Sequence, residues 1–198
     1  MAYCRLPYFV LGFHGCDKSV KEALLLGKTT LILSNNDYDW LGKGMYFGEN
    51  DPDRAMTWAK YRANHPPKDE SKRIKDPAVI GAIIDLGNCL NLFDEQNLNN
   101  LRVAYDTLVE YNKKKKLPMP QNKDGARKLD CAVINTLHSM LDKDNMHKYD
   151  SVRCPFWEGE PLYTNAYFKT KNHIQISVLN YKCIKGYFDP INQDKTCM

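Results

Sequence analysis

The chain has 198 residues, of which 43% are hydrophobic and 26% are charged, the composition of an ordinary globular protein. This length is enough for one domain with a sizeable core and too short for two well-packed ones, so we expect a single domain over residues 1–198. The formal net charge of +4 mildly favours an acidic partner such as nucleic acid, but it falls short of the strongly basic balance of a dedicated nucleic-acid binder.

The seven cysteines are scattered, odd in number and without any C-x-x-C pair. This pattern predicts no metal site and is typical of free thiols in a reducing cytoplasm. The N-terminus lacks the basic and apolar pattern of a signal segment, and apolar runs such as residues 78–86 are only strand-length. We therefore expect a cytoplasmic protein with no membrane partner.

The start of the chain predicts a strand, a helix and a second strand. Residues 8–14 form an aromatic and β-branched run, which indicates a buried strand. Ser19 with Glu22 makes a capping box, so a helix should begin there and stop before Gly27. Residues 29–33 are expected to form a short strand.

Two further elements have clear boundaries. Asp51-Pro52 places a capping residue before a proline at the first helical position, and His65-Pro66-Pro67 ends that helix. Residues 78–86 are continuously apolar, so we expect a central strand covered on both faces. The other expected elements are a helix capped by Asp94, a basic linker over 113–120, a helix near 129–141, and strands over 150–154, 162–168, 173–179 and 184–188. This order predicts an α+β fold with a mainly antiparallel sheet.

The stretch from Asn35 to Phe47 is too irregular for a helix and too polar for a core strand. Gly42 and Gly44 let its backbone adopt positive φ or approach a ligand closely. Residues 44–47 then indicate a short strand that carries Tyr46 out of the loop. Taken alone, such a stretch is more often a tight loop with a packed aromatic side chain.

Three positions could carry chemistry. His14, beside Gly15, ends the first predicted strand, where side chains meet a cleft. Gln175 alternates with apolar residues over 173–178, so its side chain should face the side opposite theirs. Each position has a plainer interpretation when taken alone: a structural hydrogen-bonding histidine, a packed tyrosine at Tyr46, and a solvent-facing strand glutamine.

Phe13-His14-Gly15, Asp39–Phe47 and His173–Ile176 together resemble the motifs of the ADP-ribosyltransferase superfamily. The likeness is to the diphtheria-toxin-like or poly(ADP-ribose)-polymerase-like branch, whose motif positions read His-Tyr-Glu, and to small bacterial members that act as toxins or defence effectors. The resemblance implies a split antiparallel β-sheet core with flanking helices around an NAD cleft. It also implies NAD as a substrate and an antitoxin or inhibitor protein as a partner.

The resemblance assigns roles in NAD binding. His14 would hydrogen-bond a ribose hydroxyl, and the backbone of Gly15 would bond the nicotinamide carboxamide. Tyr46 would stack on the nicotinamide ring, Tyr38 would form a second wall, and Gly44 would let the chain close over the ligand. Cleavage of the nicotinamide–ribose bond builds oxocarbenium character, so the site must hold that sugar while excluding water.

Gln175 departs from the His-Tyr-Glu pattern. A glutamine can hold a ribose hydroxyl, but it supplies no negative charge opposite the developing cation and cannot act as a general base. This difference favours transfer of a single ADP-ribose over polymer formation. Loss of all activity is the alternative.

A carboxylate could come from the segment that precedes the late strands. Our hypothesis is that Glu158 or Glu160 positions or deprotonates the acceptor and that Trp157 offers it a stacking face. Arg153 would pair with an NAD phosphate. The plainer alternatives are a solvated turn for the two glutamates and a surface ion pair for the arginine.

The sequence thus predicts an NAD-dependent mono-ADP-ribosyltransferase that modifies a macromolecule, with nucleic acid slightly favoured over protein. The alternatives are an NAD glycohydrolase and a catalytically inactive NAD-binding or nucleic-acid-binding module of the same fold. Lys113–Lys116 is either a solvated charge run or a contact for a phosphate backbone.

Overall fold

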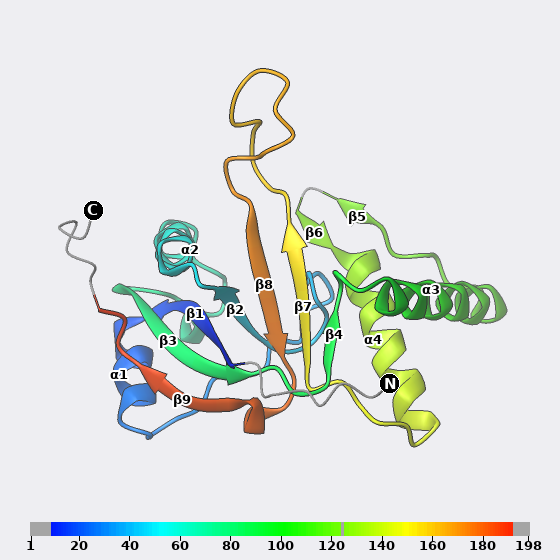
Figure 1. The fold of residues 1–198 in the computed structure, drawn as a ribbon, viewed down its shortest axis with the longest axis horizontal. Helices are drawn as coiled ribbons and strands as arrows, with labels where there is room; N and C mark the ends of the chain where they lie inside the picture. Colours follow the sequence, from blue (N-terminus) through cyan, green and yellow to red (C-terminus); the bar gives the residue numbers. More distant parts are fainter. Residues whose placement is uncertain (1–8, 124, 192–198) are drawn as a thin grey trace. The chain divides into compact units, whose positions relative to one another are not determined.

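The computed structural model describes residues 9–123 and 125–191. The chain divides into two compact units, each described by itself below. Unit 1 takes in Met1–Leu31, Phe47–Asp85 and Ile184–Met198, and unit 2 takes in Ile32–Tyr46 and Leu86–Cys183. Mostly antiparallel strands and interspersed helices make up the described residues, which confirms the predicted α+β class (Figure 1).

Unit 1 is built on an antiparallel sheet in the order β2-β1-β3-β9. Its strands are β1 (Phe9–Asp17), β2 (Met45–Glu49), β3 (Pro77–Asp85) and β9 (Ile184–Phe188). The first two residues of β2 belong to unit 2. β1 and β3 pair along their whole length, from Phe9↔Asp85 to Asp17↔Pro77. The predicted apolar strand is therefore central, with β1 on one side and β9 on the other.

The helices of unit 1 pack on this sheet through small and apolar side chains. They are α1 (Lys18–Leu25) and α2 (Pro52–Asn64); the short 3₁₀ helix η1 (Glu70–Lys72) follows α2 in the chain and has no buried residue. The Asp51 carboxylate accepts a hydrogen bond from the Arg54 amide, and α2 ends at His65, so both predicted boundaries are confirmed. Ala55 of α2 lies in a buried cluster with Phe13 and Val79.

The structure corrects two predictions in unit 1. β1 continues three residues past His14 because residues 15–17 stay in register with β3, so His14 lies inside the strand and not at its end. Helix α1 is capped by Asp17, whose carboxylate accepts hydrogen bonds from both the amide and the hydroxyl of Ser19, so Ser19 is not the cap. The part of the first predicted strand at Tyr8 lies outside the described residues.

Unit 2 is built on a three-stranded arrangement, β4-β7-β8, with α3 and α4 packed against one another. Its elements are β4 (Cys89–Asn91), α3 (Glu95–Lys115), β5 (Asn122–Lys123), β6 (Ala126–Arg127), α4 (Lys128–Lys143), β7 (Ser151–Phe156), β8 (His173–Val178) and the 3₁₀ helix η2 (Tyr181–Cys183). β7 pairs with β4 in parallel and with β8 antiparallel. The core joins the strands, the helices and the loop before β2: Leu41, Leu90, Ala104, Val133, Ile134, Leu137 and Val152.

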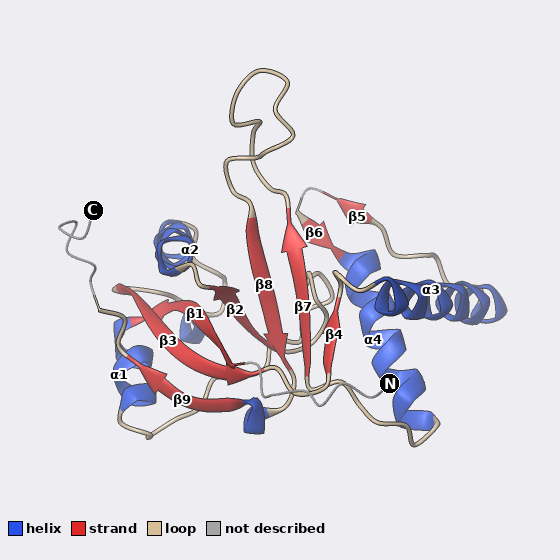
Figure 2. Ribbon diagram, viewed as in Figure 1, coloured by secondary structure: helices blue, strands red, loops and turns tan. Residues whose placement is uncertain are grey.

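Three predictions for unit 2 segments are wrong. Residues 29–33, which lead into unit 2, form no strand, and Ile32 is 89% exposed. Lys113–Lys115 belong to the last turn of α3, where basic side chains suit the helix dipole, and not to a linker. The segment 162–168 turns back on itself, with the Leu162 amide donating to the Phe168 carbonyl, and so cannot be a strand. It lies in the long β7–β8 loop, residues 157–172, which extends beyond the ends of β7 and β8 and is loop throughout (Figure 2).

Candidate functional site

His14 and Gly15 lie in β1 of unit 1. The His14 ring is half-buried and meets the Phe47 ring edge-on, with centroids 5.9 Å apart. A methyl group added at Gly15 would overlap the backbone carbonyl of Ala55, because α2 lies directly on the strand there. Helix packing therefore explains this glycine, and its predicted bond to nicotinamide stays a prediction.

Tyr46 closes its own loop in unit 2. Its hydroxyl donates to the Gly42 carbonyl (2.6 Å) and accepts from the Leu41 amide (2.9 Å), while its ring packs against the unit 2 core. Burial raises the pKa of this phenol far above its ordinary value, so the hydroxyl stays protonated. These contacts fix the position of the Tyr46 ring.

Asp39 organises the start of the same loop. One carboxylate oxygen accepts hydrogen bonds from the Ser34 hydroxyl (2.6 Å) and the Asn36 amide (2.9 Å), and the other accepts from the Asn36 side chain (3.1 Å). The Lys43 amide donates to the Asn135 side chain on α4 (3.1 Å), which ties the far end of the loop down. The sequence prediction missed the roles of Asp39 and Asn135, although aspartate is a residue whose side chain commonly hydrogen-bonds nearby backbone in turns.

Gly44 is another position of close approach. A methyl group added there would overlap the Ser177 hydroxyl, and that hydroxyl donates to the Lys43 carbonyl (3.3 Å). Tyr46 also contacts the Ser177 side chain. The loop that ends in Tyr46 therefore lies over Ser177 of β8.

Gln175 lies two residues before Ser177 and so shares its face of β8. It pairs with Cys154 of β7, whose thiol pKa is raised to about 11 by burial. Gln175 is half-buried, so it is not the solvent-facing glutamine of the plainer interpretation. Its side-chain oxygen Oε1 is buried and has no hydrogen-bond partner among the described residues. Such an atom is rare in folded proteins and is expected to meet a water or a ligand.

His173 continues this face toward the β7–β8 loop. Its Nδ1 lies 2.9 Å from the Lys171 carbonyl, which can only accept, so Nδ1 carries the proton of this bond. Its Nε2 is buried and, within the described ranges, lacks a hydrogen-bond partner, as Gln175 Oε1 does. Two unsatisfied polar atoms therefore lie two residues apart on one face of β8.

An aromatic cluster that the sequence prediction missed surrounds His173. The Trp40 and Phe156 rings lie 4.8 Å apart, and Phe156 and His173 lie 5.6 Å apart. The Arg127 guanidinium lies 4.9 Å above the Trp40 ring, whose Nε1 donates to the Gly125 carbonyl (2.7 Å). Only the tertiary structure brings these side chains together, because they come from the Tyr46 loop, β6, β7 and β8.

The structure places the predicted acceptor residues at the base of the β7–β8 loop. Glu158 is half-buried, with Oε2 3.9 Å from His173 Nδ1. Trp157 is 65% exposed, and Glu160 is also exposed. Glu158 is thus the glutamate that lies near the Gln175 face of β8, while Glu160 is solvated as the plainer interpretation has it.

Arg153 and Tyr38 lie in different surroundings. Arg153 precedes Cys154 in β7, so its side chain faces the side opposite Gln175. Its guanidinium lies 4.9 Å above the Phe93 ring, and Nη1 lies 3.5 Å from Asn91 Oδ1. Tyr38 is 49% exposed, and its backbone carbonyl accepts from the Arg127 amide. Tyr46 therefore contacts Ser177 on the face of β8 that Gln175 shares, whereas Arg153 is not part of that face.

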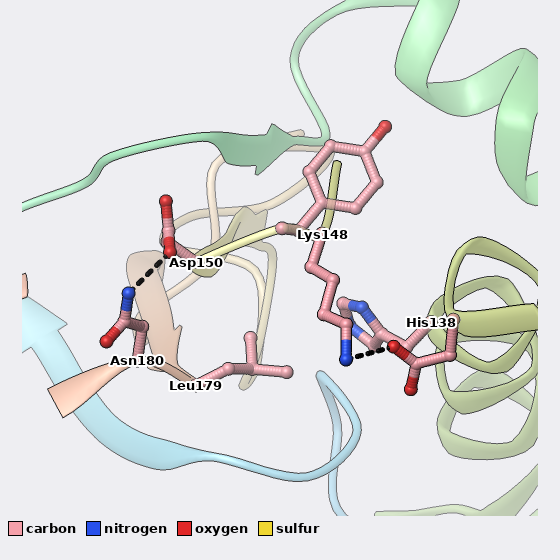
Figure 3. Close-up of a pocket in the computed structure, with 7 residues that line it drawn as sticks. His138, Lys148, Asp150, Leu179 and Asn180 are labelled. Carbon is pink, nitrogen blue, oxygen red and sulfur yellow. Dashed lines mark hydrogen bonds and ion pairs between the residues drawn. The ribbon is translucent and has the colours of Figure 1, made fainter. Parts of the chain in front are cut away.

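A cavity of about 340 Å³ elsewhere in unit 2 contains none of the predicted site residues (Figure 3). Its lining is His138, Asp142, Lys148, Tyr149, Asp150, Leu179 and Asn180. Most of its polar groups are already bonded, since Lys148 pairs with Asp142 and Asp150 accepts from Asn180 (2.7 Å). Burial lowers the pKa of His138 and keeps its imidazole neutral. A smaller hollow of about 250 Å³ lies beside Asp37, Lys128 and Cys131.

Within residues 9–123 and 125–191, no group of three or more His, Cys, Asp or Glu side chains is arranged to hold a metal ion. No helix in the same ranges is long and apolar enough to cross a lipid bilayer. Three buried side-chain atoms of unit 2 lack a hydrogen-bond partner within the described ranges: Oε1 of Gln175 and Nε2 of His173 on β8, and Nε2 of His138 at the cavity.

The chain is similar to an uncharacterized protein of Methanocaldococcus jannaschii, with 24% identity over 172 residues that cover 87% of this chain and 72% of that protein. No protein-family model matches the chain, and no solved structure matches it significantly.

Proposed function

We propose that the protein is an NAD-dependent mono-ADP-ribosyltransferase that modifies a macromolecular acceptor and has an ADP-ribosyltransferase-like fold. The observation that carries this proposal is the buried, unpartnered Oε1 of Gln175, two residues from the Ser177 side chain that Tyr46 contacts. Tyr46 and Gln175 are 129 positions apart in the sequence, yet the motif resemblance predicts that both belong to one NAD site.

The chemistry of Gln175 fits a ribose. A buried amide oxygen without a donor costs roughly 1–3 kcal/mol, and a ribose hydroxyl is a donor that would remove this cost. Glutamine adds no charge against the oxocarbenium ion that forms as nicotinamide leaves, so the site would hold the sugar without stabilising the cation strongly. Transfer of a single ADP-ribose is consistent with this weaker stabilisation.

The remaining roles follow the motif positions. His14 and Gly15 of unit 1 would bind the adenosine-side ribose and the carboxamide, and Tyr46 would stack on nicotinamide. Glu158, held near His173, is the better candidate to orient the acceptor, because Glu160 is exposed. In this function the protein works in the cytoplasm as a toxin or defence effector, and an antitoxin or inhibitor protein controls it.

Labelled NAD tests this function directly. The purified protein is offered NAD labelled in the ADP-ribose part together with protein, RNA or DNA in separate reactions. We expect label on one macromolecular pool. Gln175→Ala should lower the transfer rate roughly 100-fold, and His14→Ala should raise the Kd for NAD roughly tenfold. Gln175→Glu, which keeps the size and adds the missing charge, is the matched variant and should be at least as active.

Two rival functions give different results in the same experiment. Label that stays on small molecules while nicotinamide is released indicates an NAD glycohydrolase. NAD binding without nicotinamide release indicates an inactive binding module, which the uncharged Gln175 favours. If NAD does not bind, or if His14→Ala and Tyr46→Ala leave its Kd unchanged, the resemblance to ADP-ribosyltransferases does not extend to function.

A further inference from the structure

Helix α2 of unit 1 carries a row of aromatic side chains on its exposed face. Ala55 and Ala59 are buried and pack the helix on the sheet. Trp58 and Tyr61, on the other side, are 52% and 53% exposed, and His65 follows them just past the end of the helix. The spacing of three and then four residues places these three rings along one stripe. Packing of the sheet does not explain large aromatic side chains in that stripe.

The rings of this stripe are already stacked. The planes of Trp58 and Tyr61 differ by 20°, with centroids 5.9 Å apart, and those of Tyr61 and His65 differ by 22°, with centroids 4.3 Å apart. The Arg62 guanidinium lies 5.8 Å from the Trp58 ring centroid. A series of nearly parallel rings with an arginine beside it is a surface on which a further flat ring can stack. Nucleobases are flat rings of this kind.

The sequence segment that contains the stripe and continues past it is strongly basic. Residues 58–75 hold six basic and two acidic side chains, so this segment alone carries a net charge of +4, equal to that of the whole chain. Both acidic side chains are engaged, Asp69 with Lys72 (3.8 Å) and Glu70 with Arg73 (2.9 Å). The other basic side chains make no ion pair within the described part of the chain: Lys60, Arg62, Lys68 and Lys75.

We propose that this α2 surface, defined as Trp58, Tyr61, Arg62 and His65, binds single-stranded nucleic acid. Bases would stack on the aromatic rings, and the basic side chains of residues 58–75 would contact the phosphates. A protein partner fits less well, because lysine is depleted in the centre of protein interfaces. Where the acceptor of the proposed function is nucleic acid, this surface deepens that function by holding the strand; binding itself needs no NAD.

Binding is measured by fluorescence anisotropy without NAD, on labelled DNA and RNA single strands of about 15 nucleotides, between about 50 and 200 mM salt. Four phosphate contacts predict a slope of log K against log salt of about −2.8, and Lys68→Gln with Lys75→Gln should reduce it by about 1.4. Trp58→Ala with Tyr61→Ala should weaken binding roughly 30-fold or more, because each of the two lost base stacks contributes about 1–3 kcal/mol. Trp58→Phe with Tyr61→Phe keeps the rings and should retain most of the affinity.

The matched control is Tyr163→Ala with Tyr167→Ala, which removes two exposed rings from the electrically balanced β7–β8 loop and should leave affinity unchanged. Circular dichroism of each variant shows whether it is folded. The proposal is overturned if single strands do not bind at low salt or if the folded Trp58→Ala, Tyr61→Ala variant binds as well as the parent. Preference for duplexes, equal affinity for a free mononucleotide, or binding of protein partners alone would also overturn it. If single-stranded nucleic acid binds but NAD is not turned over, the proposed enzymatic function is refuted and the proposed binding surface is supported.

Discussion

The α2 surface in unit 1 and the β7–β8 loop in unit 2 both expose large aromatic side chains. The loop exposes five large hydrophobic side chains: Trp157, Leu162, Tyr163, Tyr167 and Phe168. None of its rings stacks on another ring in the part of the chain that the structure describes. Its two acidic and two basic side chains cancel, whereas the segment around the α2 surface carries +4.

The two regions differ in how firmly their backbone is held in place as well as in net charge. The α2 rings are held on a helix that packs on β1 and β3, so a ligand would find them already in place. The loop is held by a few backbone hydrogen bonds across its turn, such as Leu162 to Phe168 and Lys171 to Glu158. Exposure alone therefore does not identify a ligand surface. A ligand surface is better indicated by exposed rings whose geometry is fixed by packing, together with a net charge.

The largest change in stability should come from a substitution in β1, the strand on which α2 packs. Gly15→Ala would place a methyl group against the Ala55 backbone carbonyl, which cannot move without the helix, so we expect a loss of about 2–3 kcal/mol of unfolding free energy. Urea denaturation measures this loss. Gly186→Ala in β9, where the added methyl meets open space, is the control and should change stability by less than about 0.5 kcal/mol. A neutral Gly15→Ala would mean that α2 is loosely held.

Limited proteolysis compares the two regions directly. Chymotrypsin should cut at Tyr163, Tyr167 or Phe168 roughly tenfold faster than at Tyr61, because the loop can open locally while the helix is held by packing. Mass spectrometry of early fragments identifies the sites. If the first cleavage occurs inside α2, then the helix opens more readily than the loop, contrary to our expectation.

Asp17 links the cap of α1 to the end of the basic segment. Its carboxylate accepts from the Ser19 hydroxyl (2.6 Å) and also from the amides of Lys75 (2.7 Å) and Asp76 (3.0 Å). Asp17→Ala should therefore lower the unfolding free energy by about 1–2 kcal/mol. Asp53→Ala, an acidic residue in the first turn of α2 that is not its cap, is the control and should cost only a few tenths of a kcal/mol.

The pH dependence of this effect has a definite sign. The hydrogen bond from the Ser19 hydroxyl, followed by those from backbone amides, holds the pKa of Asp17 well below its ordinary value. The stabilisation is fully present above the unfolded pKa of about 3.9 and is lost as the pH falls through the lower folded pKa. The stability difference between the parent and Asp17→Asn should shrink only in strong acid. A difference that already shrinks near neutral pH would contradict this assignment.

The smallest effects should come from the exposed rings themselves. Tyr167 is 94% exposed, so Tyr167→Ala should change the unfolding free energy by less than about 0.5 kcal/mol. Trp58→Ala should cost slightly more, about 0.5–1.5 kcal/mol, because it removes one ring stack. Thermal melting of both variants measures the difference. Equal costs would show that the α2 stack adds nothing to stability.

Local patterns in the sequence were enough to predict the type and the ends of several helices and strands. The Asp51 cap and the prolines after His65 bound α2, and the apolar run near residue 80 is a central strand, because capping groups and burial act over a few neighbouring residues. The alternation around Gln175 also predicted a strand, which β8 confirms. The Asp94 cap of α3 is confirmed for the same reason.

Residues that pair or pack together are often distant in the sequence. Strand length, close approaches at glycines and clusters of side chains depend on these distant residues, so only the tertiary structure decided them. β1 continues past His14 because residues 15–17 pair with the start of β3, and the residues near His14 gave no indication of this pairing. A methyl group added at Gly15 would meet helix α2, and one added at Gly44 would meet Ser177 of β8, which are contacts with distant segments of the chain. The Trp40–Phe156–His173 cluster brings Trp40 to two side chains more than 100 residues away, and only the folded structure shows that Oε1 of Gln175 is buried without a partner among the described residues. Composition and periodicity specify burial and conformation, whereas a site depends on which distant side chains meet.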